Sequence, residues 1–141
     1  TSNHPELELI RYASRPYIFT ASLSPSTIAS TRTALKIIRS LPALRKRLWD
    51  NANFLYERIK GLGYEVGPAA SPIIAIHYRN VEEAFAIWNS LLQRGIYVNM
   101  VLPPATPGGG ALLRCSLSAA HSKEQIERIG EAFASLAGSR T

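Results

Sequence analysis

The stretch from Gly108 to Ile126, GGGALLRCSLSAAHSKEQI, most narrowly limits how this chain can fold. Its three glycines lead into the apolar run ALLRCSL, residues 111–117, which is typical of a strand. Ser122 and Gln125 have the spacing of a capping box and predict the start of a helix. A strand followed so soon by a capped helix indicates a sheet with helices packed on one of its faces.

One arginine, Arg114, stands in the middle of this strand. Side chains alternate between the two faces of a strand, so Arg114 is expected on the face opposite Leu113, Cys115 and Leu117. A guanidinium group is almost never buried without a partner. We therefore expect Arg114 to meet an anion. A structural ion pair with Asp or Glu is the alternative, although the neighbouring loop and strand contain no acidic residue.

The N-terminal part of the chain is expected to be largely helical. Residues 5–14 favour a short helix and residues 15–23 an extended segment. Ser24 and Pro25 predict the start of a helix that runs toward Arg39, because serine caps a helix and proline suits its first position. Pro42 interrupts or restarts this helix. The next helix has an apolar stripe and ends at two glycines: Leu41, Leu44, Leu48, Ala52, Leu55, Ile59, Leu62, Gly61 and Gly63.

The rest of the chain alternates strands and helices. Strands are expected at residues 64–66, 72–78 and 96–102, in addition to 111–117. Asn80 with Glu83 predicts a second capped helix, which ends at Gly95. The expected core positions of the last two helices are Val81, Ala84, Phe85, Trp88, Leu91, Leu92, Ile126, Ile129, Phe133 and Leu136. This order predicts an α/β sandwich, with helices on one side of a short, mainly antiparallel sheet.

Composition limits the class of protein. The 141 residues suffice for one domain with a core, and 46% hydrophobic and 18% charged residues are ordinary for a globular protein. No apolar run approaches the roughly 18 residues of a membrane span, and the N-terminus lacks the features of a signal peptide. Cys115 alone cannot form an internal disulfide or a metal cluster. We expect a cytoplasmic protein without a transmembrane segment.

The net charge of +6 raises the question of a nucleic-acid partner. The densest basic group, Arg45, Lys46 and Arg47, lies on an expected helix, where it indicates a solvated face or attraction of a phosphate-bearing small molecule. Neither zinc-finger spacing nor an aromatic RNA-binding motif occurs. We therefore expect no nucleic-acid partner and no metal.

Motifs of stand-alone catalysis are also missing. The sequence has no GxSxG, no HExxH and no P-loop. His77 is expected to be a packed or edge residue and His121 to shape the turn before the last helix. The four lysines all fall on expected helices, and none is predicted to be a covalent catalyst: Lys36, Lys46, Lys60 and Lys123.

Two long motifs carry a family resemblance. RPYIFTASLSPS, residues 15–26, and YVNMVLPPATPGGGALLRCSLSAAHSKEQI, residues 97–126, resemble the C-terminal part of the α-oxoamine synthases. These are pyridoxal-phosphate enzymes of aminotransferase fold type I. The resemblance extends from about residue 8 to residue 136, and PPATP…LLRCS…AAH is most similar to the bacterial serine palmitoyltransferase branch.

The resemblance implies roles for particular residues. In the family, the arginine of the LLR strand binds the α-carboxylate of the amino-acid substrate, which corresponds to Arg114. The segment that contacts the cofactor phosphate across the dimer interface corresponds to Thr20, Ala21 and Ser22. Without the resemblance, these three would be strand-end residues with local hydrogen bonds. Leu102 stands where some serine palmitoyltransferases carry an arginine that also helps to bind the carboxylate.

The resemblance also implies that much of the enzyme is missing from this chain. The family's cofactor-binding lysine would fall before residue 1, and its pyridine-nitrogen aspartate, stacking histidine and large cofactor domain have no counterpart here. We expect the end of the cofactor domain at residues 1–23, connecting helices at 24–63 and the C-terminal small domain at 64–141. No residue of this chain is then catalytic, and the chain is expected to be inactive alone.

The activity implied for the full-length enzyme, a homodimer, is condensation of an amino acid with an acyl-CoA, with loss of CO2. Serine and a long-chain acyl-CoA, which give 3-ketosphinganine, are the first choice. Another α-oxoamine synthase, acting on glycine or alanine with a different acyl-CoA, is an alternative. A non-catalytic interaction module is a second alternative.

Overall fold

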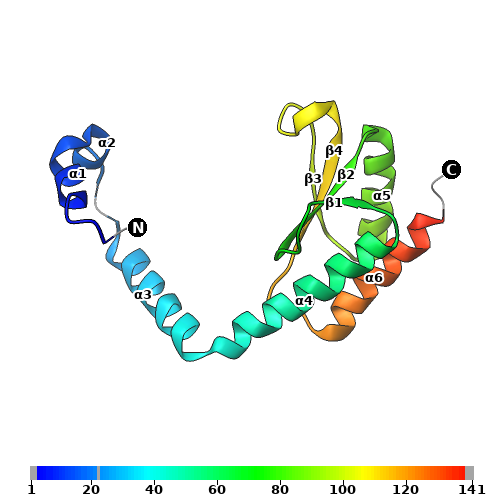
Figure 1. The fold of residues 1–141 in the computed structure, drawn as a ribbon, viewed down its shortest axis with the longest axis horizontal. Helices are drawn as coiled ribbons and strands as arrows, with labels where there is room; N and C mark the ends of the chain where they lie inside the picture. The colour runs from blue at the N-terminus through cyan, green and yellow to red at the C-terminus, as the bar shows by residue number, and fades with distance from the viewer. Residues whose placement is uncertain (1–2, 22, 139–141) are drawn as a thin grey trace. The chain divides into compact units, whose positions relative to one another are not determined.

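The computed structural model describes residues 3–21 and 23–138 (Figure 1). These residues fall into two compact units, residues 1–40 and residues 41–141. Each unit has its own secondary structure and is considered by itself. Within the described residues, no helix is both long enough and apolar enough to cross a membrane.

The N-terminal unit consists of three helices, α1 (Leu7–Ala13), α2 (Arg15–Ile18) and α3 (Pro25–Ser40). The helices expected at residues 5–14 and from Pro25 are confirmed, and the Oγ of Ser24 accepts a hydrogen bond from the Thr27 amide at 3.3 Å. None of the three helices has a buried residue. A unit of this size without a core is not expected to be stable by itself.

The extended segment expected over residues 15–23 is wrong in its first part, because Arg15–Ile18 form a helical turn. Ser14 is extended, and its carbonyl accepts hydrogen bonds from the amides of Tyr17 and Ile18. Pro16 lies in the first turn of this helix, where its missing N–H costs nothing. These backbone hydrogen bonds form a helical turn despite the β propensity of the aromatic residues.

The C-terminal unit is a four-stranded antiparallel sheet with helices on one face (Figure 1). The strands are arranged in the order β1-β2-β4-β3, and each neighbouring pair is antiparallel. This confirms the predicted fold class. The elements are α4 (Pro42–Gly61), β1 (Glu65–Val66), β2 (Ile73–Tyr78), α5 (Val81–Gln93), β3 (Asn99–Val101), a 3₁₀ turn η1 (Pro107–Gly109), β4 (Ala111–Ser116) and α6 (Lys123–Ala137).

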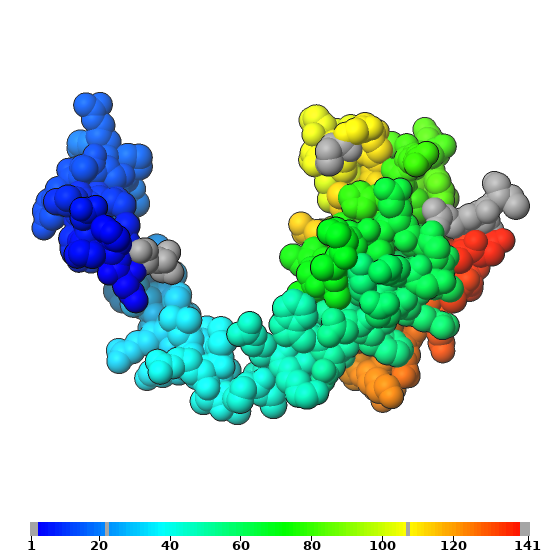
Figure 2. Space-filling view, viewed as in Figure 1, coloured from blue at the N-terminus to red at the C-terminus, as the bar shows by residue number. Residues whose placement is uncertain are grey.

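The core lies between the sheet and the three helices α4, α5 and α6. Helices α4 and α6 pack directly on each other (Figure 2). The capping box of Ser122 and Gln125 is present at the start of α6, and the Asn80 side chain caps α5. The largest fully buried side chains are Leu55, Ile59, Ile76, Leu91, Leu113, Ile126 and Phe133.

The apolar faces expected for α5 and α4 are partly wrong. In α5, Phe85 and Leu92 are exposed, while Ala84, Ile87 and Leu91 form the buried stripe with helical spacing. In α4, only the C-terminal half is buried, and Leu41 and Leu44 are exposed in the described structure. Sequence periodicity identifies an apolar face, but the length of the neighbouring sheet decides how much of that face is covered.

Candidate functional site

The face of the sheet turned away from the helices is open. Directly opposed residues of an antiparallel pair point to the same face, so the strand register identifies its members. They are Glu65, Ile73, Ala75, His77, Asn99, Val101, Leu112, Arg114 and Ser116. This surface, called the open face below, is where the sheet can meet a ligand or another part of a protein.

Arg114 lies at the centre of the open face. It is exposed, whereas its neighbours Leu113 and Cys115 are buried on the helix side. The expected alternation of this strand is therefore confirmed. In the register, Arg114 lies between Ala75 of β2 and Asn99 of β3. An arginine side chain is thus presented from a rigid central strand.

Within the described residues, the Arg114 guanidinium forms no ion pair or hydrogen bond. The structural ion pair considered as the alternative is therefore not formed by any residue that the structure describes. A guanidinium group offers a planar set of donors that matches a carboxylate or a phosphate. The open face accordingly presents a cationic group suited to an anion.

The loop between β3 and β4 is shaped by its own backbone. The hydroxyl of Thr106, a buried residue, donates to the Gly110 carbonyl at 2.5 Å. Gly108 and Gly109 have φ values of 77° and 76°, a left-handed conformation that favours glycine. Together with His77 and Arg79, this loop borders a pocket of about 390 Å³. The loop therefore has a defined conformation beside one end of the sheet.

The two histidines of the C-terminal unit differ in role. His121 accepts a hydrogen bond at Nδ1 from the Ser118 amide at 3.1 Å, which confirms that it shapes the turn between β4 and α6. His77 is half-buried on the open face, opposite Glu65 of β1 and Leu112 of β4. It is packed within the sheet, as expected.

The expected phosphate segment lies in the N-terminal unit. Thr20 and Ala21 border a pocket of about 760 Å³ together with Arg11 and Tyr17. The Thr20 hydroxyl donates to the Pro16 carbonyl, and Arg11 is 3.3 Å from Glu8. Ser22 lies outside the described residues. The pocket thus contains a guanidinium, which has N–H donors beyond those in its ion pair, and a hydroxyl whose single proton is donated to a backbone carbonyl.

All four lysines lie on helices and are exposed, as expected from the sequence. Lys46 pairs with Asp50 at 2.7 Å, and Lys123 pairs with Glu127 at 3.6 Å. Lys123 also borders a groove of about 510 Å³ beside His121. None of the four lysines borders the pocket that contains Thr20.

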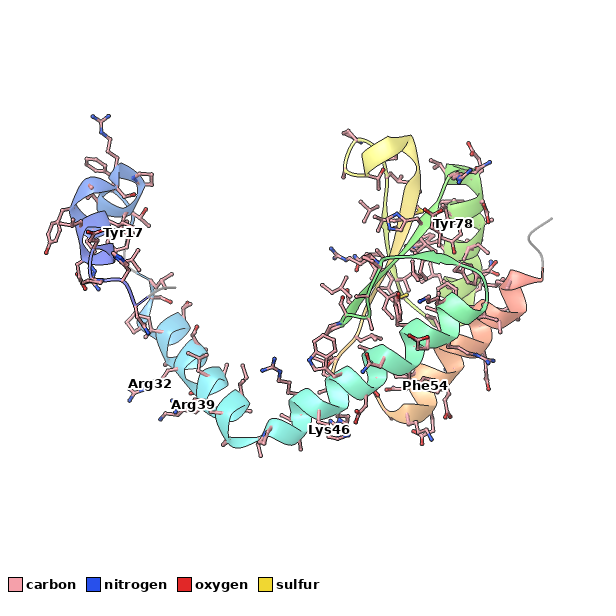
Figure 3. All side chains as sticks on the ribbon, viewed as in Figure 1. Tyr17, Arg32, Arg39, Lys46, Phe54 and Tyr78 are labelled. Atoms are coloured by element: carbon pink, nitrogen blue, oxygen red, sulfur yellow. The ribbon has the colours of Figure 1, made fainter. Side chains whose placement is uncertain are left out.

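The positive charge is less evenly spread than expected. Residues 9–49 contain no Asp or Glu, whereas the rest of the chain has no excess of basic residues. Figure 3 shows Arg32 and Arg39 leaving α3 on the same side, as a separation of seven residues predicts. The basic residues of this stretch are Arg11, Arg15, Arg32, Lys36, Arg39, Arg45, Lys46 and Arg47.

Sequence reasoning missed the neighbours of Arg114 on the open face. Asn99 and Ala75 are far from Arg114 in sequence, and only the register of β3, β4 and β2 brings them together. A polar Asn99 inside the run IYVNMVL was a usable signal, because an amide in an apolar strand marks a polar face.

A helix-backed antiparallel sheet that presents an arginine on its open face defines an α/β domain suited to anion binding. The chain belongs to the aminotransferase class I and II family, whose pattern matches residues 2–133.

Individual relatives are consistent with this family. The chain is 49% identical to the serine palmitoyltransferase of Caulobacter vibrioides (strain NA1000 / CB15N), over 91% of this chain and 32% of that protein. It is 33% identical to an 8-amino-7-oxononanoate synthase of Alkaliphilus metalliredigens (strain QYMF), over 93% of this chain and 33% of that protein. This chain therefore spans about a third of the relatives that it matches.

A solved structure of a serine palmitoyltransferase is also similar to this chain. The serine palmitoyltransferase of Sphingomonas paucimobilis, solved with a bound adduct of pyridoxal phosphate (PLP) and myriocin, has a TM-score of 0.90 and 42% identity. The similarity covers 99% of this chain and 35% of that chain. The described fold is thus also found within a much longer polypeptide.

Proposed function

We propose that this chain is the C-terminal part of a PLP-dependent enzyme that condenses an amino acid with an acyl-CoA, with loss of CO2. The observation that carries the proposal is Arg114, an exposed arginine without a partner among the described residues, at the centre of the open face. Membership of the aminotransferase class I and II family and the names of the relatives support it.

The residues present fit only one part of the cofactor. The Arg11 guanidinium and the Thr20 hydroxyl border one pocket and can donate to the cofactor phosphate, the hydroxyl by giving up its bond to the Pro16 carbonyl. No lysine borders that pocket, so the covalent attachment point must come from elsewhere in the full-length enzyme. We assign Thr20, Ala21 and Ser22 to phosphate binding on this basis and on the family resemblance.

When bound, PLP supplies an electron sink for the carbanion formed at the α-carbon of the amino acid. The role of this chain is to hold the substrate. Arg114 binds the α-carboxylate through two parallel N–H donors, which fixes the orientation of the bonds around the α-carbon.

For the substrates, we propose L-serine and a long-chain acyl-CoA, which give 3-ketosphinganine. The relative named serine palmitoyltransferase is more similar to this chain than the relative named 8-amino-7-oxononanoate synthase, at 49% against 33% identity. The basic stretch at residues 9–49 supports attraction of the CoA phosphates. Leu102, which supplies no second cation near the loop, leaves glycine and alanine as alternative substrates.

The substrate assignment can be tested on the full-length enzyme that contains this chain. Purified enzyme would be supplied with palmitoyl-CoA and, in separate reactions, with serine, glycine or alanine, and CO2 release would be measured. Release with serine that exceeds release with the other two supports the proposal. Preference for glycine or alanine, or release only when a short-chain acyl-CoA replaces palmitoyl-CoA, would assign the protein to another branch of the α-oxoamine synthases. No release with any combination would contradict the proposal.

We further propose that the full-length enzyme is a homodimer. Within each subunit, we propose that residues 1–23 end the cofactor domain, residues 24–63 connect the two domains and residues 64–141 form the small domain. The absence of buried residues from α1, α2 and α3 supports a larger assembly, because these helices need a partner surface. Replacement of Ala21 by Trp should weaken cofactor retention without unfolding the protein. A monomeric active enzyme, measured by light scattering, would rule out the dimer.

A further inference from the structure

Asn99 is the polar residue nearest to Arg114 in the strand register. It pairs directly with Arg114 between β3 and β4, and both side chains lie on the open face. The Cβ atoms of directly opposed residues in an antiparallel pair are about 4.5–5.5 Å apart. The amide of Asn99 and the guanidinium of Arg114 can therefore reach the same small ligand.

The surroundings of this pair are otherwise apolar or small. Ala75 lies on the other side of Arg114, while Leu112 and Val101 pair with each other next to the Asn99–Arg114 pair. The small side chain of Ala75 leaves space beside the guanidinium. A ligand held by Arg114 thus meets an amide on the β3 side and a methyl group on the β2 side.

The Asn99 side chain has no hydrogen-bond partner among the residues that the structure describes. Asn99 is half-buried, so its side-chain amide stays accessible on the open face to water or to a ligand. Arg114 also has no partner in the described part of the chain, so both side chains offer N–H donors on the same face of the sheet. Leu102, beyond the end of β3, adds no charge to these donors.

We propose that Asn99 and Arg114 form one carboxylate-binding site, in which the amide N–H of Asn99 donates to the carboxylate that Arg114 holds. This inference rests on the proposed function, because it takes the ligand to be the substrate amino acid. Asn99 is then a specificity-determining residue. The neutral side-chain amide of Asn99 helps to orient the carboxylate that Arg114 binds, without adding a second positive charge.

The test uses the full-length enzyme loaded with cofactor and two probes, L-serine and ethanolamine, which is the same amine without the carboxylate. Their dissociation constants would be measured from the absorbance change of the bound cofactor. For Asn99→Ala, binding of L-serine should weaken by about tenfold, as expected for a lost hydrogen bond to a charged group. Binding of ethanolamine should stay unchanged, because no carboxylate is present.

Two further variants sharpen the test. Asn99→Asp places a carboxylate opposite Arg114, so it should compete with the substrate and weaken serine binding more than Asn99→Ala does. The matched control is Asn89→Ala, an exposed asparagine of α5, which should bind both probes like the parent. A purely structural role for Asn99 would instead weaken binding of both probes together.

Failure of the inference can be told apart from failure of the proposed function. If Arg114→Ala weakens serine binding and Asn99→Ala does not, the shared site is wrong while the role of Arg114 stands. If Arg114→Ala leaves serine binding unchanged, the proposed role of Arg114 is wrong and the shared site is overturned with it. The inference is supported if Asn99→Ala and Arg114→Ala each weaken binding of L-serine and leave binding of ethanolamine unchanged.

Discussion

The side-chain amide of Asn51 donates a hydrogen bond to the backbone carbonyl of His121, 3.2 Å away and 70 residues later in the sequence. The same amide donates to the Ser118 carbonyl at 3.3 Å. Asn51 is only 9% exposed, so these bonds are largely shielded from water. The two hydrogen bonds hold the turn between β4 and α6 against the middle of α4.

Loss of this link should destabilise the fold. Replacement of Asn51 by Ala removes the side-chain donor from both carbonyl oxygens, although the Ser118 carbonyl still accepts a bond from the His121 amide. The free energy of unfolding should fall by about 1–3 kcal/mol. Asn51→Asp should cost at least as much, because an ionised carboxylate cannot donate. Urea unfolding measures the effect, with the exposed Asn53→Ala of the same helix as control. Equal stability of the Asn51 and Asn53 variants would contradict this reading.

Gly110 should not tolerate a side chain. A Cβ at this position would lie 2.4 Å from the Tyr78 carbonyl oxygen, where the loop passes the end of β2. Replacement of Gly110 by Ala should therefore shift the loop and cost about 1–3 kcal/mol of stability. Gly61→Ala is the control, because Gly61 ends α4 and a Cβ there meets no atom within 4 Å. If both variants have the melting temperature of the parent, the backbone at Gly110 does not pass close to the Tyr78 carbonyl.

Cys115 should make stability fall in alkaline solution. Burial raises the pKa of its thiol from the ordinary 9.0 to about 12. Above about pH 9 the unfolded thiol loses its proton while the folded one keeps it, so the free energy of unfolding should decrease by up to about 1.4 kcal/mol per pH unit until about pH 12. Below about pH 9 this group should have no effect.

Urea unfolding at several alkaline pH values, compared with Cys115→Ala, isolates this contribution from other titrating groups. The variant will be less stable overall, so the comparison concerns the slope with pH and not the absolute stability. Parallel slopes for the two proteins would show that the thiol is not shielded.

Arg114 should be the main anchor of the substrate carboxylate in the full-length enzyme. Replacement of Arg114 by Ala should weaken amino-acid binding by roughly tenfold to a hundredfold, the value of a charge-assisted hydrogen bond or pair of bonds. Arg114→Lys should restore only part of the affinity, because an ammonium group cannot reproduce the planar fork. Circular dichroism should show both variants folded, since Arg114 is outside the core. Lys60→Ala, which removes an exposed charge from α4, should bind like the parent.

The 141-residue chain alone should not bind PLP covalently. Its lysines are all exposed on helices, without a shielded pocket that would hold the cofactor and favour a stable adduct. Incubation with PLP, reduction with borohydride and mass spectrometry should give at most scattered, substoichiometric labelling. A single lysine labelled to completion would show that a complete cofactor site exists within this chain.

The sequence was most informative where local patterns have one physical solution. The alternation around Arg114, the capping box at Ser122 and the strand at residues 72–78 each predicted the observed element. The family resemblance added the candidate roles of Thr20 to Ser22, which no local pattern could supply.

What could not be predicted depends on contacts between distant segments. Nothing in the run around Asn99 indicates that it pairs with Arg114, because strand register is set by the whole sheet. The exposed Phe85 shows the same limit, since the packing of α5 on the sheet decides which helix face is buried. The link from Asn51 to His121 likewise needed the relative placement of α4 and α6.

The lack of buried residues in α1, α2 and α3 has a practical consequence. All buried hydrophobic side chains of the described residues lie between Ala52 and Leu136. A shortened polypeptide that begins near Leu41 would keep this entire core and lose the exposed apolar helices that favour aggregation. Limited digestion with trypsin should therefore cut first among the basic residues of α3 and leave the sheet and its helices as the resistant product.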